Sequence, residues 1–179
     1  MAGSAPVPDP GADPWPSYAS AVIELVVGDE HLVLTPLPDP AADDGEDRGP
    51  VLGPVLGSVP VWVLTAGDPY PVTLPSEENA ARNAVLRQRL DELRLAHAPA
   101  LGRSPDGATS EASIAVSGAE QQVVLDLAAE FGQLAVYAID HHIACIDVAS
   151  ARTVTVRPYR LARAPRASGS LVGPTGWTG

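Results

Sequence analysis

The sequence predicts a single α+β domain, and this prediction rests on hydrophobic periodicity, turn signals and chain length. Between residues 61 and 148, short apolar runs typical of strands alternate with two segments of helical spacing. Clusters of Gly, Pro, Asp and Ser separate these segments, as expected for turns. With 179 residues, the chain is long enough for one domain with a hydrophobic core.

Three segments are predicted to lie outside or to interrupt the ordered domain, which we place at residues 18–157. Residues 1–17 are rich in proline and aspartate and are expected to be disordered. Residues 38–60 are acidic and rich in Pro and Gly, which predicts a flexible insertion. Residues 158–179 contain arginine and no acidic residue, and we expect a disordered tail.

The elements of the domain follow from local patterns. Two β-rich runs, 20–27 and 31–35, flank Gly28-Asp29-Glu30 and predict an N-terminal hairpin. Further strands are expected at 61–66, 95–100, 112–117, 134–139 and 143–148. Helices are expected from Ser76 to about Arg94, and from the capping-box sequence Ser117-Gly-Ala-Glu120 to Gly132.

The order of these elements indicates a topology. From residue 61 to 139 it is strand, helix, strand, strand, helix, strand (βαββαβ), which is the split βαβ order of ferredoxin-like domains. Such domains pack two helices on one face of an antiparallel sheet with the spatial order 4-1-3-2. The strand at 143–148 would be an extra C-terminal strand at one edge, and the N-terminal β-hairpin would cover or extend an edge.

Two asparagines on the first helix predict a polar site. Asn79 and Asn83 continue the helix face formed by Leu86, Leu90 and Leu93, so both should point inward, where an unpaired amide is costly. In the predicted sheet, the first strand ends beside the starts of the third and fourth strands. Six residues are therefore expected to converge as a binding site for a small polar or nucleotide-like ligand: Thr65, Asp68, Asn79, Asn83, Glu111 and Gln133.

The same cluster allows a second interpretation. Buried polar groups usually serve as structural hydrogen-bond partners. The chain would then be a non-enzymatic interaction or regulatory module, with a protein partner bound through the acidic insertion or the Arg-containing tail. An open pocket at the cluster favours a ligand, and a filled one favours the module. The sequence identifies no catalytic residue and no cofactor, so it leaves open whether the protein is an enzyme.

Four motifs occur in order within residues 60–140. They are Val63-Leu-Thr-Ala-Gly-Asp-Pro69, then Glu78-Asn-Ala-Ala-Arg-Asn83 with Leu86, then Glu111-Ala-Ser113, and then Phe131-Gly-Gln133. Together they resemble the bacterial domain-of-unknown-function family 3293. Members usually have Thr-Ala-aromatic-Asn-Pro where this chain has Gly67 and Asp68, so a possible stacking surface is missing and a carboxyl group replaces an amide. The resemblance implies no particular activity.

Charge and composition exclude several classes of function. The net charge is −11, and the basic residues are all arginine. Such an acidic body would repel phosphate backbones, so a nucleic-acid partner is not expected. The absence of lysine excludes Schiff-base chemistry and, with abundant Ala, Gly, Pro and Val, indicates a GC-rich bacterial genome.

Neither a membrane nor a metal is expected. No apolar run approaches the ~18 residues of a membrane span, and the single cysteine, Cys145, favours a cytoplasmic location. His141-His142-x-x-Cys145-x-Asp147 superficially resembles a metal-binding spacing. Strand alternation, however, would place His142 opposite Cys145 and Asp147, which leaves too few converging ligands.

Overall fold

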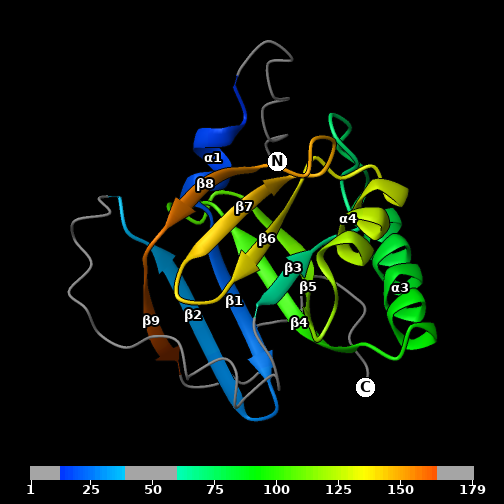
Figure 1. The fold of residues 1–179 in the computed structure, drawn as a ribbon, viewed down its shortest axis with the longest axis horizontal. Helices are drawn as coiled ribbons and strands as arrows, with labels where there is room; N and C mark the ends of the chain where they lie inside the picture. The colour runs from blue at the N-terminus through cyan, green and yellow to red at the C-terminus, as the bar shows by residue number, and fades with distance from the viewer. Residues whose placement is uncertain (1–12, 39–59, 165–179) are drawn as a thin grey trace, which may run out of the picture.

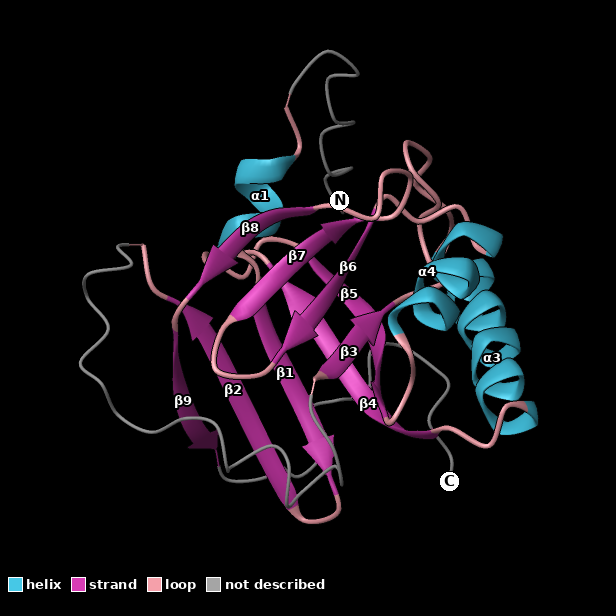
Figure 2. Ribbon diagram, in the orientation of Figure 1, coloured by secondary structure: helices cyan, strands magenta, loops and turns pink. Residues whose placement is uncertain are grey.

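The computed structural model describes residues 13–38 and 60–164, which form one large sheet with helices packed on its outside (Figure 1, Figure 2). The predicted α+β class is confirmed. The strands are β1 (Val22–Val27), β2 (Glu30–Pro36), β3 (Val61–Leu64), β4 (Ala96–Arg103), β5 (Ser110–Ser117), β6 (Ala135–Ile139), β7 (Ile143–Asp147), β8 (Thr153–Arg157) and β9 (Tyr159–Ala164). The helices are α1 (Trp15–Ser20), α3 (Ser76–Glu92) and α4 (Gln121–Glu130).

The sheet is antiparallel and nearly closed. Its strand order is β8-β7-β6-β3-β5-β4-β1-β2-β9. The two end strands, β8 and β9, are separated in the chain by Pro158 alone, so the sheet curls until its ends approach each other. The expected N-terminal hairpin is present as β1 and β2, and it extends the sheet by pairing with β4. The expected extra strand is β7, which pairs with β6.

Strand alternation divides the hydrophobic residues into two cores. On β3, Val61 and Val63 face the inside of the curled sheet, where they pack with residues of β1, β2 and Tyr159. Trp62 and Leu64 face the other way and pack with α3 and α4. Both helices therefore cover one outer side of β3, β5 and β6, while the interior of the sheet has its own core.

The two long helices form where they were expected, with different ends. On α3, Asn83, Leu86 and Leu90 are buried, but Leu93 is 50% exposed because the helix already ends at Glu92. The predicted capping box is wrong: Gly118 has a φ of 74°, which is not helical, and α4 begins only at Gln121 after Glu120. Gly132, at a φ of 74°, follows α4 in the left-handed conformation that was expected of it.

Both predicted disordered ends need correction. Residues 1–17 were expected to be disordered, but α1 begins at Trp15 and lies at one end of the sheet. Residues 158–179 were expected to be a tail, but 159–164 form β9, which pairs with β2 along its whole length. Most of the predicted insertion, residues 39–59, lies outside the described residues.

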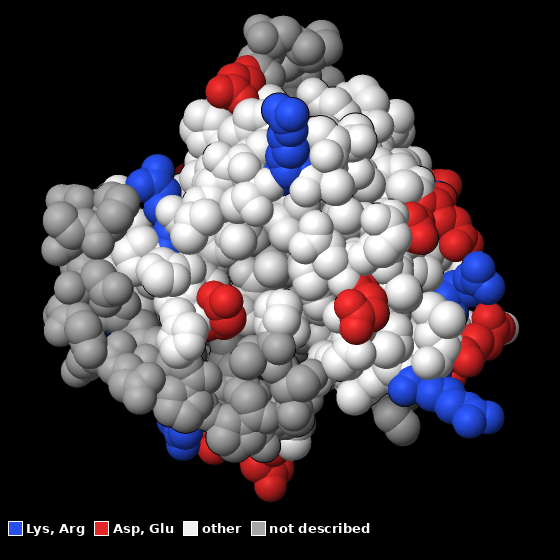
Figure 3. Space-filling view, in the orientation of Figure 1, with Lys and Arg blue, Asp and Glu red and all other residues white. Residues whose placement is uncertain are grey.

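The described surface is mixed in charge. In Figure 3, charged side chains stand apart over the strands, while acidic and basic groups lie next to one another on the side of α3. There Arg89 pairs with Glu92 and with Glu130 of α4. Within residues 13–38 and 60–164, no helix has the length and apolar character needed to cross a membrane.

Candidate functional site

The polar cluster predicted from the sequence forms at one end of the sheet, where β3 ends and β5 and β6 begin. The Thr65 hydroxyl donates a hydrogen bond to the Ala112 carbonyl oxygen at 2.9 Å. The Gln133 amide donates to the carbonyl oxygen of Gly67 at 2.5 Å. These bonds join the loop after β3 to the starts of its two neighbouring strands, as the predicted strand order required.

Asn83 links this loop to α3. Its side chain is 4% exposed; its Oδ1 accepts a hydrogen bond from the Ala66 amide at 2.9 Å, and its Nδ2 donates to the Ala112 carbonyl at 3.0 Å. The helix periodicity explains this position, since Asn83 lies on the same buried face as Leu86 and Leu90. The amide is therefore satisfied by the chain's own backbone.

Asn79 and Asp68 fix the next part of the loop. The Asp68 amide donates to Asn79 Oδ1 at 2.8 Å, and Asn79 Nδ2 donates to Asp68 Oδ1 at 2.8 Å. The same carboxylate oxygen accepts from the Leu74 amide at 2.7 Å. Asp68 has a φ of 34°, a backbone conformation that aspartate tolerates better than most residues. These reciprocal bonds hold residues 68–74 against the start of α3.

Arg82, a third side chain of α3, also binds the loop after β3, and it was not identified from the sequence. Its Nε donates to the Ala66 carbonyl and its Nη2 to the Phe131 carbonyl, both at 2.6 Å. The guanidinium also lies 5.7 Å from the centre of the Phe131 ring. Arg82 thus ties the loop after β3 to the end of α4. Its position three residues after Asn79 on the same helix was the available signal.

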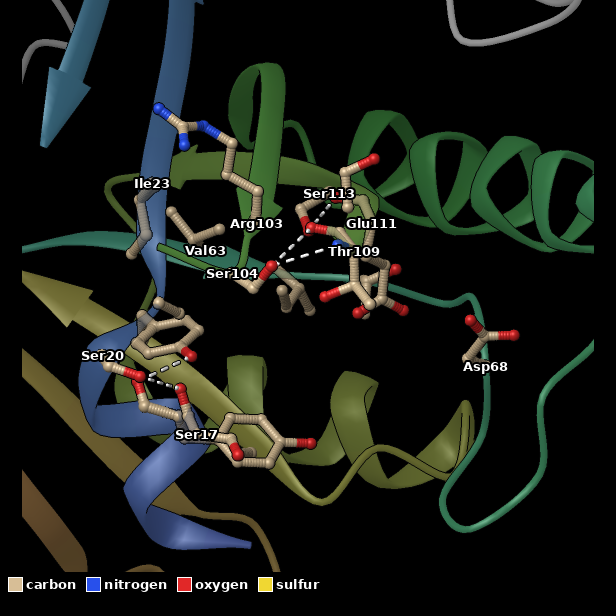
Figure 4. Close-up of a pocket in the computed structure, with 18 of the residues that line it drawn as sticks. Ser17, Ser20, Ile23, Val63, Asp68, Arg103, Ser104, Thr109, Glu111 and Ser113 are labelled. Atoms are coloured by element: carbon tan, nitrogen blue, oxygen red, sulfur yellow. Dashed lines mark hydrogen bonds between the residues drawn. The ribbon is translucent and has the colours of Figure 1, made fainter. Parts of the chain in front are cut away.

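A cavity of about 390 Å³ opens at this end of the sheet (Figure 4). Ser17 and Ser20 of α1 lie on one side, and Ser104, Thr109 and Glu111 lie opposite them. The residues that line it are Ser17, Tyr18, Ser20, Ala21, Ile23, Val63, Leu64, Thr65, Asp68, Gly102, Arg103, Ser104, Pro105, Thr109, Ser110, Glu111, Ser113, Gln133, Ala135 and Tyr137. The cavity therefore combines an apolar floor with many hydroxyl groups, a mixture typical of small-molecule sites.

The six predicted site residues divide into two groups. Thr65, Asp68, Glu111 and Gln133 line the cavity. Asn79 and Asn83 do not line it; they lie behind the loop and hold its backbone. The structure thus brings all six residues into one region but assigns the two asparagines to support.

Glu111 is the most unusual of the lining residues. It lies on β5 two residues before Ser113 and four before Ala115, so alternation directs it to the inside of the sheet. Its Oε1 is shielded from solvent and has no hydrogen-bond partner. Burial raises the pKa of this carboxyl group to about 8, and the neighbouring Asp68 contributes in the same direction, while the Thr65 hydroxyl opposes the shift. At neutral pH the group is therefore mostly protonated.

Two tyrosines that sequence analysis did not include in the site also line the cavity. The Tyr137 hydroxyl donates to the carbonyl oxygen of Tyr18 at 3.1 Å, and the two rings lie 6.3 Å apart. Burial, followed by the charge of Glu111, raises the pKa of Tyr18 to about 12. Tyr137 was identifiable from its alternation with Ala135 and Ile139 on β6. Tyr18 was not, because it falls next to the segment expected to be disordered.

The one arginine among the lining residues is already paired. Arg103 Nε donates to Glu24 Oε1 at 2.6 Å, and its guanidinium points away from Glu111 in Figure 4. His31 lies 2.9 Å from the other oxygen of Glu24. Burial alone would raise the pKa of Glu24, but the hydrogen bonds from Arg103 and His31 outweigh burial and lower it. The Arg103 charge is thus balanced outside the cavity.

Among the described residues, no three His, Cys, Asp or Glu side chains are grouped so that they could hold a metal ion. Cys145 is buried, and its burial raises its pKa to about 12, so the thiol stays protonated.

Comparison with known proteins gives one match. Residues 64–136 match the model of a family described as a protein of unknown function (DUF3293). This stretch runs from the end of β3 into β6 and contains all six predicted site residues, and it confirms the family resemblance found in the sequence. No curated protein and no solved structure matches the chain.

Proposed function

We propose that this chain, whose residues 64–136 match the DUF3293 family model, binds a small polar molecule in the cavity at the end of its sheet. The observation that supports this most is Glu111, a largely buried carboxyl group with an unpartnered oxygen. Leaving a buried polar atom without a hydrogen bond costs roughly 1–3 kcal/mol, so such atoms are rare unless they have a role. Since Glu111 also lines the cavity, a ligand bound there would lie against the accessible side of this carboxyl group.

The size of the cavity and the residues that line it restrict the kinds of ligand that can bind there. A volume of about 390 Å³ suits a compound of a few rings or fewer. The hydroxyl groups of Ser17, Ser104 and Ser113 line the cavity, and the oxygens of the last two can accept hydrogen bonds although their protons are donated to Asp106 and to the Glu111 carbonyl. A phosphate group is disfavoured, because Asp68 and Glu111 line the cavity and the charge of Arg103 is balanced by Glu24. A nucleotide-like ligand would therefore bind here through its base or sugar.

A second function has its own support. The hydrogen bonds described above for Asn79, Asn83 and Arg82 all join backbone groups or Asp68 of the same chain. This part of the cluster fits the alternative of a non-enzymatic interaction or regulatory module with a structural polar network. The two functions differ in what they require of the cavity, since only the ligand-binding function needs it open.

A thermal-shift screen of small metabolites tests the proposal. The informative variant is Ser110→Trp, because Ser110 is exposed and lines the cavity, so a bulky indole there should hinder ligand binding. Thr153→Trp is the matched control, since Thr153 is also exposed at the start of a strand but does not line the cavity. We expect ligands that stabilise the wild type and the control but not Ser110→Trp. Ligands that stabilise all three proteins equally, or no stabilising ligand at all, would contradict the proposal.

We also propose that β3 to β6, with α3 and α4, form a ferredoxin-like unit within the larger sheet. Support comes from the strand order β6-β3-β5-β4 and from both helices packing on one side. Native-state hydrogen exchange tests this proposal. Amides of β3 and β5 should remain protected in a partly unfolded form in which β8 and β9 exchange, whereas exchange of all strands in one step would contradict it.

A further inference from the structure

We propose that the ligand of this cavity carries a protonated amino, amidino or guanidino group, and that this cation pairs with the carboxylate of Glu111. The inference rests on the proposed function and names the chemical class of its ligand. It follows from the way Glu111 is enclosed, from the charges around it and from the aromatic rings beside it.

The enclosure of Glu111 limits what can compensate its charge. A Cβ placed on Gly67 would lie 3.3 Å from Glu111 Oε1, so this oxygen is pressed against the loop after β3. Neither solvent nor a protein donor reaches it. The carboxyl group nevertheless lines the cavity. The Thr65 hydroxyl, which stabilises the charged form of this carboxyl group, is neutral, so a positive charge that compensates Glu111 must come from the cavity side, where a ligand binds.

The groups that face Glu111 favour a cation. Asp68, in the loop before α3, is a second carboxyl group and acts on Glu111 electrostatically. Tyr18 of α1 and Tyr137 of β6 contribute neutral phenols. Arg103 of β4 is neutralised by Glu24, and Arg82 of α3 is held by the carbonyl oxygens of Ala66 and Phe131. Among the described residues that line the cavity, no positively charged side chain is therefore available to pair with the carboxyl groups of Glu111 and Asp68.

The tyrosines add a second attraction for a cation. Both rings line the cavity, with their centres 6.3 Å apart. The face of an aromatic ring attracts ammonium and guanidinium groups, most strongly where water is displaced. A neutral aromatic ligand can also stack on these rings, but only a cation gains the additional electrostatic attraction.

Binding of the cation would release a proton. In the empty cavity at neutral pH, Glu111 is mostly protonated, since its pKa is about 8. When the cation binds, the carboxyl group gives its proton to the solvent and becomes the carboxylate partner of the ligand. The apparent affinity of a cation should therefore increase about tenfold for each unit by which the pH rises toward 8, as linkage requires.

Three probes of nearly equal shape test the inference. Benzamidine is a cation, benzamide is neutral and benzoate is an anion. Calorimetry on the full chain should show benzamidine binding at least tenfold more tightly than benzamide at pH 7.5, with benzoate the weakest. The affinity of benzamidine should fall about tenfold between pH 7.5 and 6.5, and that of benzamide should not change.

Two variants identify the residue responsible. In Glu111→Gln, benzamidine should keep at most a few-fold preference over benzamide, due to Asp68 and the tyrosine rings, and its pH dependence should disappear. Glu77→Gln removes an exposed carboxylate at the start of α3 and should leave both properties unchanged. Thermal unfolding of each variant verifies that it is folded.

The outcomes separate this inference from the proposed function. If benzamide binds as tightly as benzamidine, and Ser110→Trp abolishes both, the cavity is a ligand site and the cation inference is wrong. The same holds if benzamidine fails to bind while neutral metabolites bind in the cavity. If neither the probes nor any metabolite binds, the proposed function fails and this inference fails with it.

Discussion

The raised pKa of Glu111 predicts that the stability of the protein depends on pH. Its pKa is about 8 in the folded chain and 4.5 when exposed, so the folded state holds a proton that the unfolded state loses. The contribution of Glu111 to stability therefore falls as pH rises between about 5 and 8, by ~1.4 kcal/mol per pH unit, and this contribution is constant below and above that range. At pH 7, ionisation of Glu111 in the unfolded state costs the wild type about 3 kcal/mol.

Glu111→Gln removes this group and keeps nearly the same shape. The difference in free energy of unfolding between variant and wild type should increase with pH in favour of the variant, by about 3 kcal/mol between pH 4.5 and 7. All other titrating groups are common to both proteins and cancel in the difference. Any packing effect of the glutamine is independent of pH and appears as the constant difference at pH 4.5.

Urea unfolding followed by circular dichroism at pH values from 4.5 to 8.5 measures this difference. Glu77→Gln provides the control, and its difference from the wild type should lack this rise. A difference for Glu111→Gln that stays flat, or that shifts in favour of the wild type as pH rises, would refute the reasoning. The first result would mean an ordinary exposed carboxyl group, and the second a carboxylate stabilised by the fold.

Three further substitutions test the support of the site and the closure of the sheet, all by urea unfolding. Asn83→Ala should cost about 3 kcal/mol, because it leaves the Ala66 amide unpaired in a buried place; Asn79→Ala, at a half-buried position, should cost less. Gly67→Ala should cost about 1 kcal/mol, since its Cβ would lie 3.2 Å from the Asn79 side chain; no loss would mean that this loop yields freely. Tyr159→Ala should cost about 4 kcal/mol, whereas Val156→Ala, at an exposed position, should cost under about 0.5 kcal/mol; equal costs would contradict a structural β9.

The central part of the fold was predictable because its signals are local. Helical spacing placed Asn83, Leu86 and Leu90 on one buried face, and turn residues separated β4 from β5. The closure of the sheet has no local signal. Tyr159 and Leu161 do alternate as in a strand, but Arg160 between them and Pro158 before them indicated a tail. Their burial depends on pairing with β2, more than 120 residues earlier in the chain.

The candidate site was predictable to the same degree. Strand ends that meet across a sheet brought Thr65, Glu111 and Gln133 together, as the strand order implied. The role of each residue there depends on the direction in which its side chain points, and spacing in the sequence does not determine that direction. Asn83 faces the backbone of the loop, whereas Glu111 faces the cavity. Tyr18 reaches the cavity from α1, a helix of six residues that is too short for helical periodicity to appear in the sequence.

The most direct test is a titration of the Glu111 carboxyl carbon by ¹³C NMR, with Glu111→Gln to assign the signal. In the free protein we expect a midpoint of about 8. With saturating benzamidine we expect that midpoint to fall by at least about two units, because the bound cation favours the carboxylate. A midpoint near 4.5 in the free protein, or a raised midpoint that benzamidine and every ligand from the metabolite screen leave unchanged, would contradict the account of this cavity as a site built around Glu111.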